Sequence, residues 1–288
     1  MKLLRYDDPV IFQSAIMDYL LMNEAENNLP LGILANLIAG EYQDPPPYLA
    51  QVEDQGETCL VVMRTPPFKA LSSFDSDPLD EEIVSLVAND LYKTFGEDFP
   101  GVTAEKSMAA QLSESWQAAT GKTPLLEMAM RIYKLEQVKP VSGVSGSIRP
   151  ANEDDASMVL KWYENFHRDA LREDPNPKQV KEQAARYIKA DPSQRGLMIW
   201  EVEGIPVSMA GYTGPTTNGI RIGAVYTPPD VRRKGYASAC TAGLSQHLLD
   251  LGFKFCFLFT DLMNPTSNHI YQQIGYEPVC DVDSIKFI

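Results

Sequence analysis

The sequence predicts an α/β (α+β) protein built as two domains, each with a sheet flanked by helices. Its 288 residues are enough for two domains of ordinary size. Its hydrophobic content of 44% is typical of a globular chain with a sizeable core. In both halves the apolar residues alternate between helical and strand spacing, which indicates helices packed against mixed sheets.

A short stretch of small, uncharged residues marks the domain boundary. Pro140 to Gly146 reads PVSGVSG and follows a long strand-like run of apolar and aromatic residues. We therefore expect a first domain at residues 1–140, a linker at 141–146 and a second domain at 147–288.

The elements of the first domain follow from apolar spacing and turn residues. The segment EDQGE separates two strands of a hairpin, and the apolar positions of 79–95 recur at helical spacing. The expected elements are a helix at 11–22, strands at 48–52 and 59–63, a helix at 79–95, a strand at 101–104, a helix at 105–119 and a strand at 125–135.

The second domain is predicted in the same way. In its helix at 235–251, one face is expected to carry Ala237, Cys240, Leu244, Leu248 and Leu251, and Gly252 supplies the C-terminal stop. The other expected elements are a strand at 147–149, helices at 155–171 and 178–190, strands at 197–202, 207–212 and 221–226, a strand at 253–260, a helix at 265–274, and strands at 277–280 and 284–288.

The charge is unevenly distributed. Residues 1–140 carry 10 basic and 22 acidic side chains, a net charge of −12, whereas residues 141–288 carry 15 and 17, a net charge of −2. An acidic surface repels a phosphate backbone, so we expect no nucleic-acid partner. No apolar run approaches the roughly 20 residues of a membrane span, and MKLLRYDD lacks the apolar core of a secretory signal. We expect a cytoplasmic protein without membrane contact. The sequence does not indicate an oligomeric state.

Cysteine and histidine spacing argues against a metal site or a disulfide framework. Four cysteines, at 59, 240, 256 and 280, show no CxxC pair and lie in apolar surroundings, so we expect buried free thiols. The three histidines are widely spaced, and no metal cofactor is predicted.

The stretch from Val225 to Ser238, VYTPPDVRRKGYAS, has the composition of an anion-binding loop. A strand ends at Tyr226, two prolines turn the chain, and a basic loop with Gly235 leads into a helix. Helix N-termini present unpaired N–H groups and a partial positive charge. Because basic residues at that end oppose the helix dipole, such a loop needs an anion. The alternative is a solvated, positively charged loop that only begins a helix.

A second polar stretch, DLMNPTSNHIYQQIGYEP, begins with an N-cap. Asn264 precedes Pro265 at the first helical position, and both residue types are favoured there. At about 100° per residue, Asn264, Ser267, Asn268 and Tyr271 share one sector of the helix. This face is either exposed and solvated or part of a site.

These two stretches resemble the signatures of the GNAT superfamily of acetyl-CoA-dependent N-acetyltransferases. The coenzyme signature Gln/Arg-x-x-Gly-x-Gly/Ala is met by Arg232, Gly235 and Ala237 after a strand. An Asn-led helix with a Tyr before a Gly-Tyr pair is met by Asn264, Tyr271 and Gly275-Tyr276. The element order of 147–288 is similar too. The resemblance implies a mixed, mostly antiparallel sheet flanked by helices for this domain.

The resemblance also implies site roles. Backbone amides from Arg233 to Ser238 would hold the pyrophosphate of acetyl-CoA, and Tyr271 would protonate the departing thiolate as general acid. Val225 and Thr227 would pair with the pantetheine arm, and Asn264 would contact it. The full set expected to bind the coenzyme is Val225, Tyr226, Thr227, Arg232, Arg233, Lys234, Gly235, Tyr236, Ala237, Ser238, Asn264, Ser267 and Asn268.

The general base is unassigned. The family often carries a Glu on the strand before the loop, whereas the strand RIGAVYT has none. Glu201, Glu203 and Asp261 are candidates only by their positions at sheet ends, and each also fits a structural or solvated role. A water relay would serve equally well. The aromatic residues Trp162, Tyr163 and Phe166 fit the core better than an acceptor pocket. His167 beside them is expected to be a surface or packing residue rather than a base.

The first domain partly repeats the element order of the second. It is either a degenerate copy of the same fold or an unrelated accessory domain. The segment before its helix at 79–95 reads DSDPLDEE, which would repel a diphosphate, so we expect no coenzyme there.

The leading hypothesis is an N-acetyltransferase that moves acetyl from acetyl-CoA to an amine by direct attack in a ternary complex. The alternatives are a non-catalytic acyl-CoA-binding or regulatory module, and an interaction protein whose acidic half docks a basic partner. The acceptor stays open among small amines, antibiotics, amino acids, peptides and protein N-termini.

Overall fold

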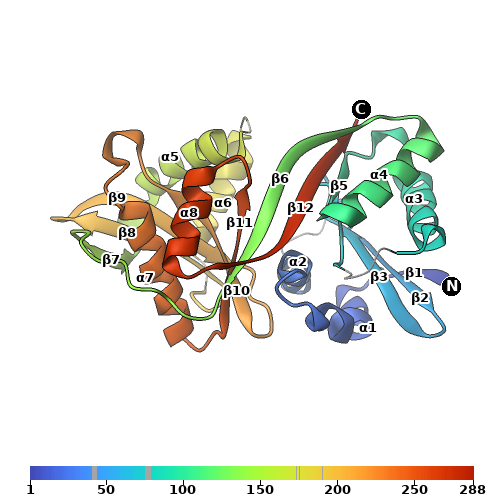
Figure 1. Ribbon diagram of the computed structural model, residues 1–288, viewed down its shortest axis with the longest axis horizontal. Helices are drawn as coiled ribbons and strands as arrows, with labels where there is room; N and C mark the ends of the chain where they lie inside the picture. Colours follow the sequence, from blue (N-terminus) through green and yellow to red (C-terminus); the bar gives the residue numbers. More distant parts are fainter. Residues whose placement is uncertain (41–43, 75–78, 173, 175, 190) are drawn as a thin grey trace. The chain divides into compact units, whose positions relative to one another are not determined.

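A computed structural model describes residues 1–40, 44–74, 79–172, 174, 176–189 and 191–288 (Figure 1). The chain divides into two compact units. The first contains Met1–Ile132, Asp261–Met263 and Val279–Ile288, and the second contains Tyr133–Thr260 and Asn264–Pro278. Each unit is an α/β domain with a mixed sheet, as the sequence predicts. None of the helices in the described residues is long and apolar enough to cross a membrane.

The first unit has helices on both faces of its sheet. Its strands lie in the order β1-β2-β3-β4-β5-β12-β6, and most neighbouring pairs are antiparallel. One core lies between the sheet and α1 and α2, and another between the sheet and α3 and α4. The elements are β1 (Lys2–Arg5), α1 (Pro9–Met22), α2 (Asn28–Ile38), β2 (Tyr48–Asp54), β3 (Glu57–Arg64), β4 (Ala70–Ser72), α3 (Glu81–Phe95), β5 (Gly101–Glu105), α4 (Lys106–Thr120), β6 (Pro124–Leu135) and β12 (Glu277–Phe287).

The last strand of the chain, β12, completes the sheet of the first unit. It pairs antiparallel with β5, from Val282 opposite Glu105 to Lys286 opposite Gly101. Gly101 has a φ of 137°, and a Cβ there would lie 2.0 Å from the carbonyl oxygen of Ile285, so only glycine allows this approach. Phe287 stacks on Trp116 with ring centroids 5.2 Å apart. The grouping thus differs from the expected boundaries, which assigned 279–288 to the second domain, and the two predicted end strands form one.

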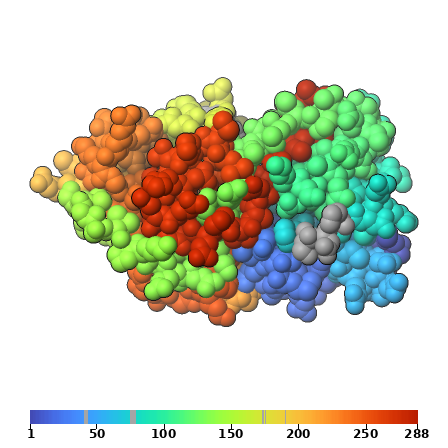
Figure 2. Space-filling model, viewed as in Figure 1, coloured from blue at the N-terminus to red at the C-terminus, as the bar shows by residue number. Residues whose placement is uncertain are grey.

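In the described residues of the second unit, strands lie in the order β11-β10-β9-β8-β7; β10 pairs parallel with β11, and the pairs β10–β9, β9–β8 and β8–β7 are antiparallel. The face with α7 and α8 forms one core and the face with α5 and α6 another. Figure 2 shows α8 in red at the surface. The elements are β7 (Ser147–Pro150), α5 (Ala156–Phe166), the π turn η3 (His167–Leu171), α6 (Pro177–Lys189), β8 (Arg195–Val202), β9 (Ile205–Thr213), β10 (Gly219–Tyr226), α7 (Tyr236–Asp250), β11 (Phe255–Asp261) and α8 (Pro265–Ile274).

The four cysteines are free thiols, as expected. Cys240 and Cys256 are buried, and burial raises the pKa of both thiols to about 12, so neither is a reactive thiolate at neutral pH. Cys59 and Cys280 are only half-buried, so the expectation of buried thiols holds for Cys240 and Cys256 alone.

Candidate functional site

The site is built around the parallel strands β10 and β11, whose pairing stops before their C-terminal ends. Their described register runs only from Gly219 opposite Phe255 to Arg221 opposite Phe257. The register of β10 with β9 shifts between Gly223 and Tyr226, and Ala224 has a φ of 50°. A bulge of this kind bends its strand, and the pairing of β10 with β11 ends before it. The C-terminal part of β10 therefore presents backbone groups that an extended ligand can pair with.

Hydroxyl groups hold the end of β10 in place. The buried side chain of Ser208 on β9 donates to the carbonyl of Tyr226 at 3.1 Å. The hydroxyls of Ser208 and Thr227 lie 2.8 Å apart. Val225, Tyr226 and Thr227, the strand residues predicted to contact a coenzyme arm, thus lie at the bulged end of the strand. Val225 packs on the α7 side and Tyr226 on the α5 side.

The loop that follows ends in an uncapped helix N-terminus. Gly235, the N-cap of α7, has a φ of 82°, and Arg233 has a φ of 66°. The first helical hydrogen bond runs from the Ala239 N–H to the Gly235 carbonyl at 3.0 Å. No side chain caps the helix, and within the described residues the amides of Tyr236, Ala237 and Ser238 have no acceptor. Such a terminus binds anions.

The three basic residues of the loop differ in what they contact. Arg232 donates through Nε to the Thr227 carbonyl at 2.8 Å and pairs through Nη2 with Asp169 Oδ2 at 2.6 Å. Its guanidinium thus ties the loop to the strand end and to η3. Arg233 and Lys234 are exposed and form no ion pair with another described residue. They are therefore the loop cations available to an anion.

The linker at 141–146 packs against this loop, and the sequence alone does not predict that contact. A Cβ at Gly235 would lie 2.8 Å from Val144 Cγ2, so the loop can pack on Val144 only because residue 235 is glycine. Trp200 Nε1 donates to the Ser145 carbonyl at 3.0 Å, which holds the linker on β8. Only the α7 end of this contact is visible as a motif in the sequence, because Val144 lies about 90 residues earlier.

Two of the polar residues predicted on α8 organise the start of the helix. The Asn264 side chain accepts from the Ser267 N–H at 3.1 Å, and the Asn268 amide donates to the Asn264 carbonyl at 2.8 Å. Asn268 Oδ1 in turn accepts from the buried Tyr133 hydroxyl at 3.0 Å. Ser267 is half-buried. Tyr133 was not singled out in the sequence, because it comes from a strand over a hundred residues away.

Tyr271 is buried on α8 and packs edge-to-face against Tyr276, with ring centroids 5.9 Å apart. Burial raises its pKa to about 12. Its hydroxyl makes no hydrogen bond with another described residue. The phenol is thus protonated at neutral pH and able to donate to a ligand.

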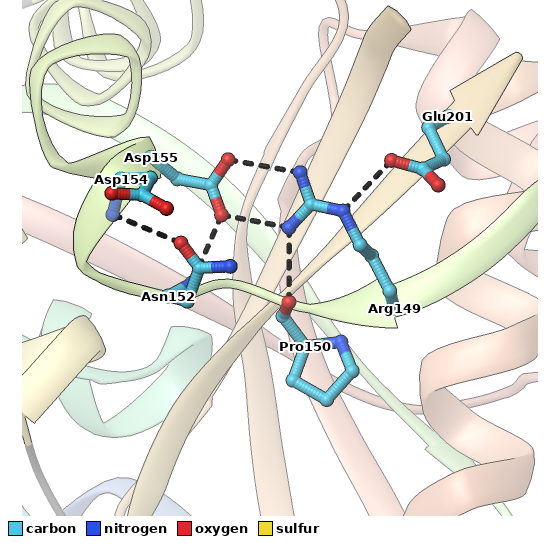
Figure 3. A network of polar contacts seen from close by, with 6 residues as sticks. All are labelled: Arg149, Pro150, Asn152, Asp154, Asp155 and Glu201. Atoms are coloured by element: carbon cyan, nitrogen blue, oxygen red, sulfur yellow. Dashed lines mark hydrogen bonds and ion pairs between the residues drawn. The ribbon is translucent and has the colours of Figure 1, made fainter. Parts of the chain in front are cut away.

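The three candidate bases, Glu201, Glu203 and Asp261, either make hydrogen bonds within the protein or lie in an exposed turn. Glu201 accepts from Arg149 Nε at 2.7 Å, and Arg149 also binds both oxygens of Asp155 at 2.7 and 2.9 Å (Figure 3). Hydrogen bonds from Arg149 hold the pKa of Asp155 below its usual range. Glu203 is exposed in the β8–β9 turn with a φ of 53°, and Asp261 accepts from the Met263 N–H at 2.7 Å. Glu201 is therefore part of a network of ion pairs that connects β7 and β8 to Asp155, just before α5.

The aromatic residues of α5 pack in the core. Trp162 and Tyr163 are each 8% exposed and lie in the cluster formed with Met209, Ala224 and other residues of the sheet. Phe166 is partly buried against the same cluster. The His167 ring contacts Tyr163 edge-on at a centroid distance of 4.9 Å. In the parts of the chain that are described, no group of His, Cys, Asp and Glu side chains could hold a metal ion.

The first unit has helices in corresponding order, but carboxylates cap their N-termini. Asp80 accepts from the Glu82 N–H at 3.2 Å, and Glu105 accepts from the Ser107 N–H at 2.8 Å. The seventh residue after the cap is Leu112 in α4, at the position where α8 carries Tyr271. These ends are already capped by negative charge, and α4 lacks the phenol. Part of the acidic segment before α3, residues 75–78, lies outside the described residues.

Comparison with known proteins agrees with this geometry. Residues 158–276 match the family model described as the acetyltransferase (GNAT) family. None of the curated proteins matches the sequence.

Three solved structures resemble nearly the whole chain. A GCN5-related N-acetyltransferase from Sphaerobacter thermophilus is 13% identical, with a TM-score of 0.62 over 99% of this chain and 95% of the other. A GNAT-family acetyltransferase from Colwellia psychrerythraea is 9% identical, with a TM-score of 0.60 over all of both chains. A tandem GNAT protein from the clavulanic acid biosynthesis pathway is 13% identical, with a TM-score of 0.56 over 100% of this chain and 98% of the other. At such identities the likeness establishes the fold alone.

Proposed function

Because residues 158–276 match the model of the GNAT acetyltransferase family, we propose that this protein transfers an acetyl group from acetyl-CoA to an amine. The observation that carries the proposal is the combination, in one unit, of a bulged strand end, an uncapped helix N-terminus and a protonated buried phenol. The bulge lies at Ala224, the helix begins after Gly235, and the phenol is that of Tyr271. The second unit holds all three.

The coenzyme-binding role rests on backbone groups. The amides of Tyr236, Ala237 and Ser238 would hold the pyrophosphate, with Arg233 and Lys234 as counter-charges. The pantetheine arm would pair with β10 near Val225 and Thr227 as an added strand. Arg232 would position the loop through Thr227 and Asp169. Asn264 and Asn268 would hold the first turn of α8 beside this arm, with the Ser267 hydroxyl as a further contact.

The chemical step is direct attack. The amine nitrogen forms a bond with the thioester carbonyl carbon, the carbon–sulfur bond breaks, and the sulfur leaves with the electron pair. Tyr271 donates its proton to that sulfur and regains one from solvent, while the nitrogen loses a proton to water. A phenol with a pKa of about 12 remains protonated until a strongly basic group forms beside it. Positioning of the two substrates supplies most of the acceleration.

The second candidate function is a non-catalytic acyl-CoA-binding module. It is favoured by the absence of a carboxylate on β10 and by the engagement of Glu201 with Arg149. Direct attack needs only one proton removed from the amine, which a water relay accomplishes, so transfer remains the better-supported function.

Calorimetry with CoA, followed by a CoA-release assay over a panel of amines, tests the proposal. We expect one CoA bound per chain, because Asp80 and Glu105 cap the corresponding helices of the first unit. We expect turnover with at least one amine. Binding without turnover over the whole panel would favour the binding module, and two coenzymes per chain would contradict the assignment of one binding unit.

A further inference from the structure

A row of polar side chains crosses the sheet of the second unit on its α5–α6 face. Arg195 on β8 lies opposite Thr213 on β9, and Thr213 lies opposite Arg221 on β10. Directly opposed residues of antiparallel strands project from the same face. Arg195 Nε donates to Thr213 Oγ1 at 3.0 Å. Two guanidinium groups from different strands therefore flank one threonine.

Tyr187 of α6 lies over this part of the face. A Cβ at Gly211, two residues before Thr213, would lie 2.8 Å from the Tyr187 ring, so the ring rests directly on the backbone of β9. Burial raises the pKa of the Tyr187 phenol, and the charges of Arg195 and Arg221 partly counteract this. The phenol thus lies near both guanidinium groups and is protonated at neutral pH. Tyr187 of α6, Arg195 of β8 and Arg221 of β10 thus lie on the same part of this face.

The row borders open space beside the bulge. Gly223 lies opposite Gly211 and two residues after Arg221, on the same face. A Cβ at Gly223 would meet no atom within 4 Å. The described pairing of β10 with β11 stops at Arg221. Two residues of strand span roughly 7 Å. A ligand over Gly223 can therefore reach the arginine row at one end and the bulged strand end at the other.

We propose that the open space over Gly223, together with the adjoining row of polar side chains, binds an anionic group, a carboxylate or a phosphate, carried by the acceptor amine. Arg195 and Arg221 would hold the anion, Tyr187 would donate a hydrogen bond to it, and the amine would extend over Gly223 to the bulge. Guanidinium forks match the planar pairs of oxygens of such groups. The inference deepens the proposed function and rests on it, and it names amines bearing an anionic group as the acceptor class.

The test compares acceptors of equal length that differ in charge. The purified full chain with acetyl-CoA is assayed with the unbranched ω-amino acids from glycine to 6-aminohexanoate, with their carboxamides, and with aminoalkylphosphonates of matching lengths. We expect the best anionic acceptor to have a kcat/KM roughly tenfold or more above its carboxamide, in line with charge-assisted hydrogen bonds. The carboxylate and phosphonate arms distinguish the two sources of the anion.

Single substitutions test whether Arg195 and Arg221 cause the preference for anionic acceptors. Arg221→Gln and Arg195→Gln should each lower kcat/KM for the anionic acceptor by roughly 10 to 100-fold and change that for the carboxamide by less than about twofold. Arg168→Gln is the control, because this arginine is exposed and contacts Asn165 at 3.4 Å. It changes the net charge equally and should alter neither value. CoA affinity measured for each variant reports whether the unit is folded.

Two outcomes would overturn the inference: equal kcat/KM for anionic and neutral acceptors in the wild type, or equal loss for both acceptors in the folded arginine variants. Turnover of neutral amines alone would overturn this inference and leave the proposed function standing. Failure of every amine, neutral or anionic, would instead overturn the proposed function.

Discussion

The hydroxyl groups of Tyr276 and Ser245 lie 2.9 Å apart in the core of the second unit. Ser245 also donates to the Thr241 carbonyl at 2.8 Å, so it accepts from the phenol. Tyr276 follows α8 and packs edge-to-face on Tyr271, whereas Ser245 belongs to α7. This buried bond therefore joins the helix whose N-terminus would hold the pyrophosphate to Tyr276, the ring that packs against the proposed general acid Tyr271.

The two partners of this bond should differ in their effect on stability. Ser245→Ala leaves a fully buried phenol without a partner and should lower the free energy of unfolding by about 1–3 kcal/mol. Tyr276→Phe leaves Ser245 bonded to Thr241 and should lower it by only about 1 kcal/mol. Urea unfolding measures both. A larger effect for Tyr276→Phe than for Ser245→Ala would contradict the assigned donor and acceptor.

Tyr271→Phe should lower kcat by roughly 10²-fold or more, because a general acid contributes about 10²–10⁴-fold, and leave the Kd for CoA nearly unchanged. The phenol acts in its protonated form, and its pKa of about 12 means that this form is lost only as the pH rises towards that value. The kcat of the wild type should therefore show no alkaline decline due to Tyr271 below about pH 11. Equal turnover of the two proteins would exclude the role.

Reversing the charges of Arg233 and Lys234 should weaken coenzyme binding. Arg233→Glu with Lys234→Glu should raise the Kd for CoA by roughly tenfold or more at low ionic strength, and salt should reduce the difference through screening. Lys161→Glu with Lys254→Glu is the matched control, since both lysines are exposed and lie outside the loop. Calorimetric titration measures the Kd. Unchanged binding in the loop variant would remove the pyrophosphate assignment.

Gly235→Ala should impair binding for two separable reasons. The residue has a φ of 82°, and its new Cβ would lie 2.8 Å from Val144 Cγ2. The backbone strain alone costs about 1–2 kcal/mol. Adding Val144→Ala should recover part of the CoA affinity, because it removes the clash but not the strain. Gly252→Ala is the control, with a φ of 104° and nothing within 4 Å. It should lower stability without changing CoA affinity.

Glu201→Gln should leave kcat within about twofold of the wild type, because Glu201 binds Arg149. A large loss of kcat in this variant would restore Glu201 as a candidate base.

Asp155→Asn should lower the free energy of unfolding at neutral pH by more than about 1 kcal/mol. The pKa of Asp155 is depressed in the folded protein, so its contribution is present above the unfolded pKa of about 3.9 and is lost as the pH falls through the folded value. The stability difference from wild type should thus shrink below about pH 4.

The helices that carry the candidate site were predictable nearly to the residue. The expected helix at 265–274 is α8, and that at 235–251 is α7, Tyr236–Asp250. In both cases a cap residue and an amphipathic face are encoded within one short stretch. The expected helix at 155–171 instead ends as α5 at Phe166 and continues as the π turn η3. Apolar spacing does not distinguish the two helical forms.

Elements with weak local signals were missed. β4 has only three residues, Ala70–Ser72, and β1 only four, Lys2–Arg5. α2 contains Pro30 and Gly32 and buries both, so its sequence lacks the pattern of a surface helix. These segments gain their structure from packing and pairing rather than from propensity.

Contiguous residues encode the anion loop and the two helix starts, because prolines, Gly235 and Asn264 act on their own neighbours in the chain. The remaining features of the fold and the site depend on contacts between residues far apart in the sequence. Pairing with β5 groups the last strand with the first unit, Arg149 engages Glu201, and the register of β8, β9 and β10 aligns Arg195 with Arg221. Such pairings depend on which strands become neighbours, and strand spacing in a sequence carries no information about the partner.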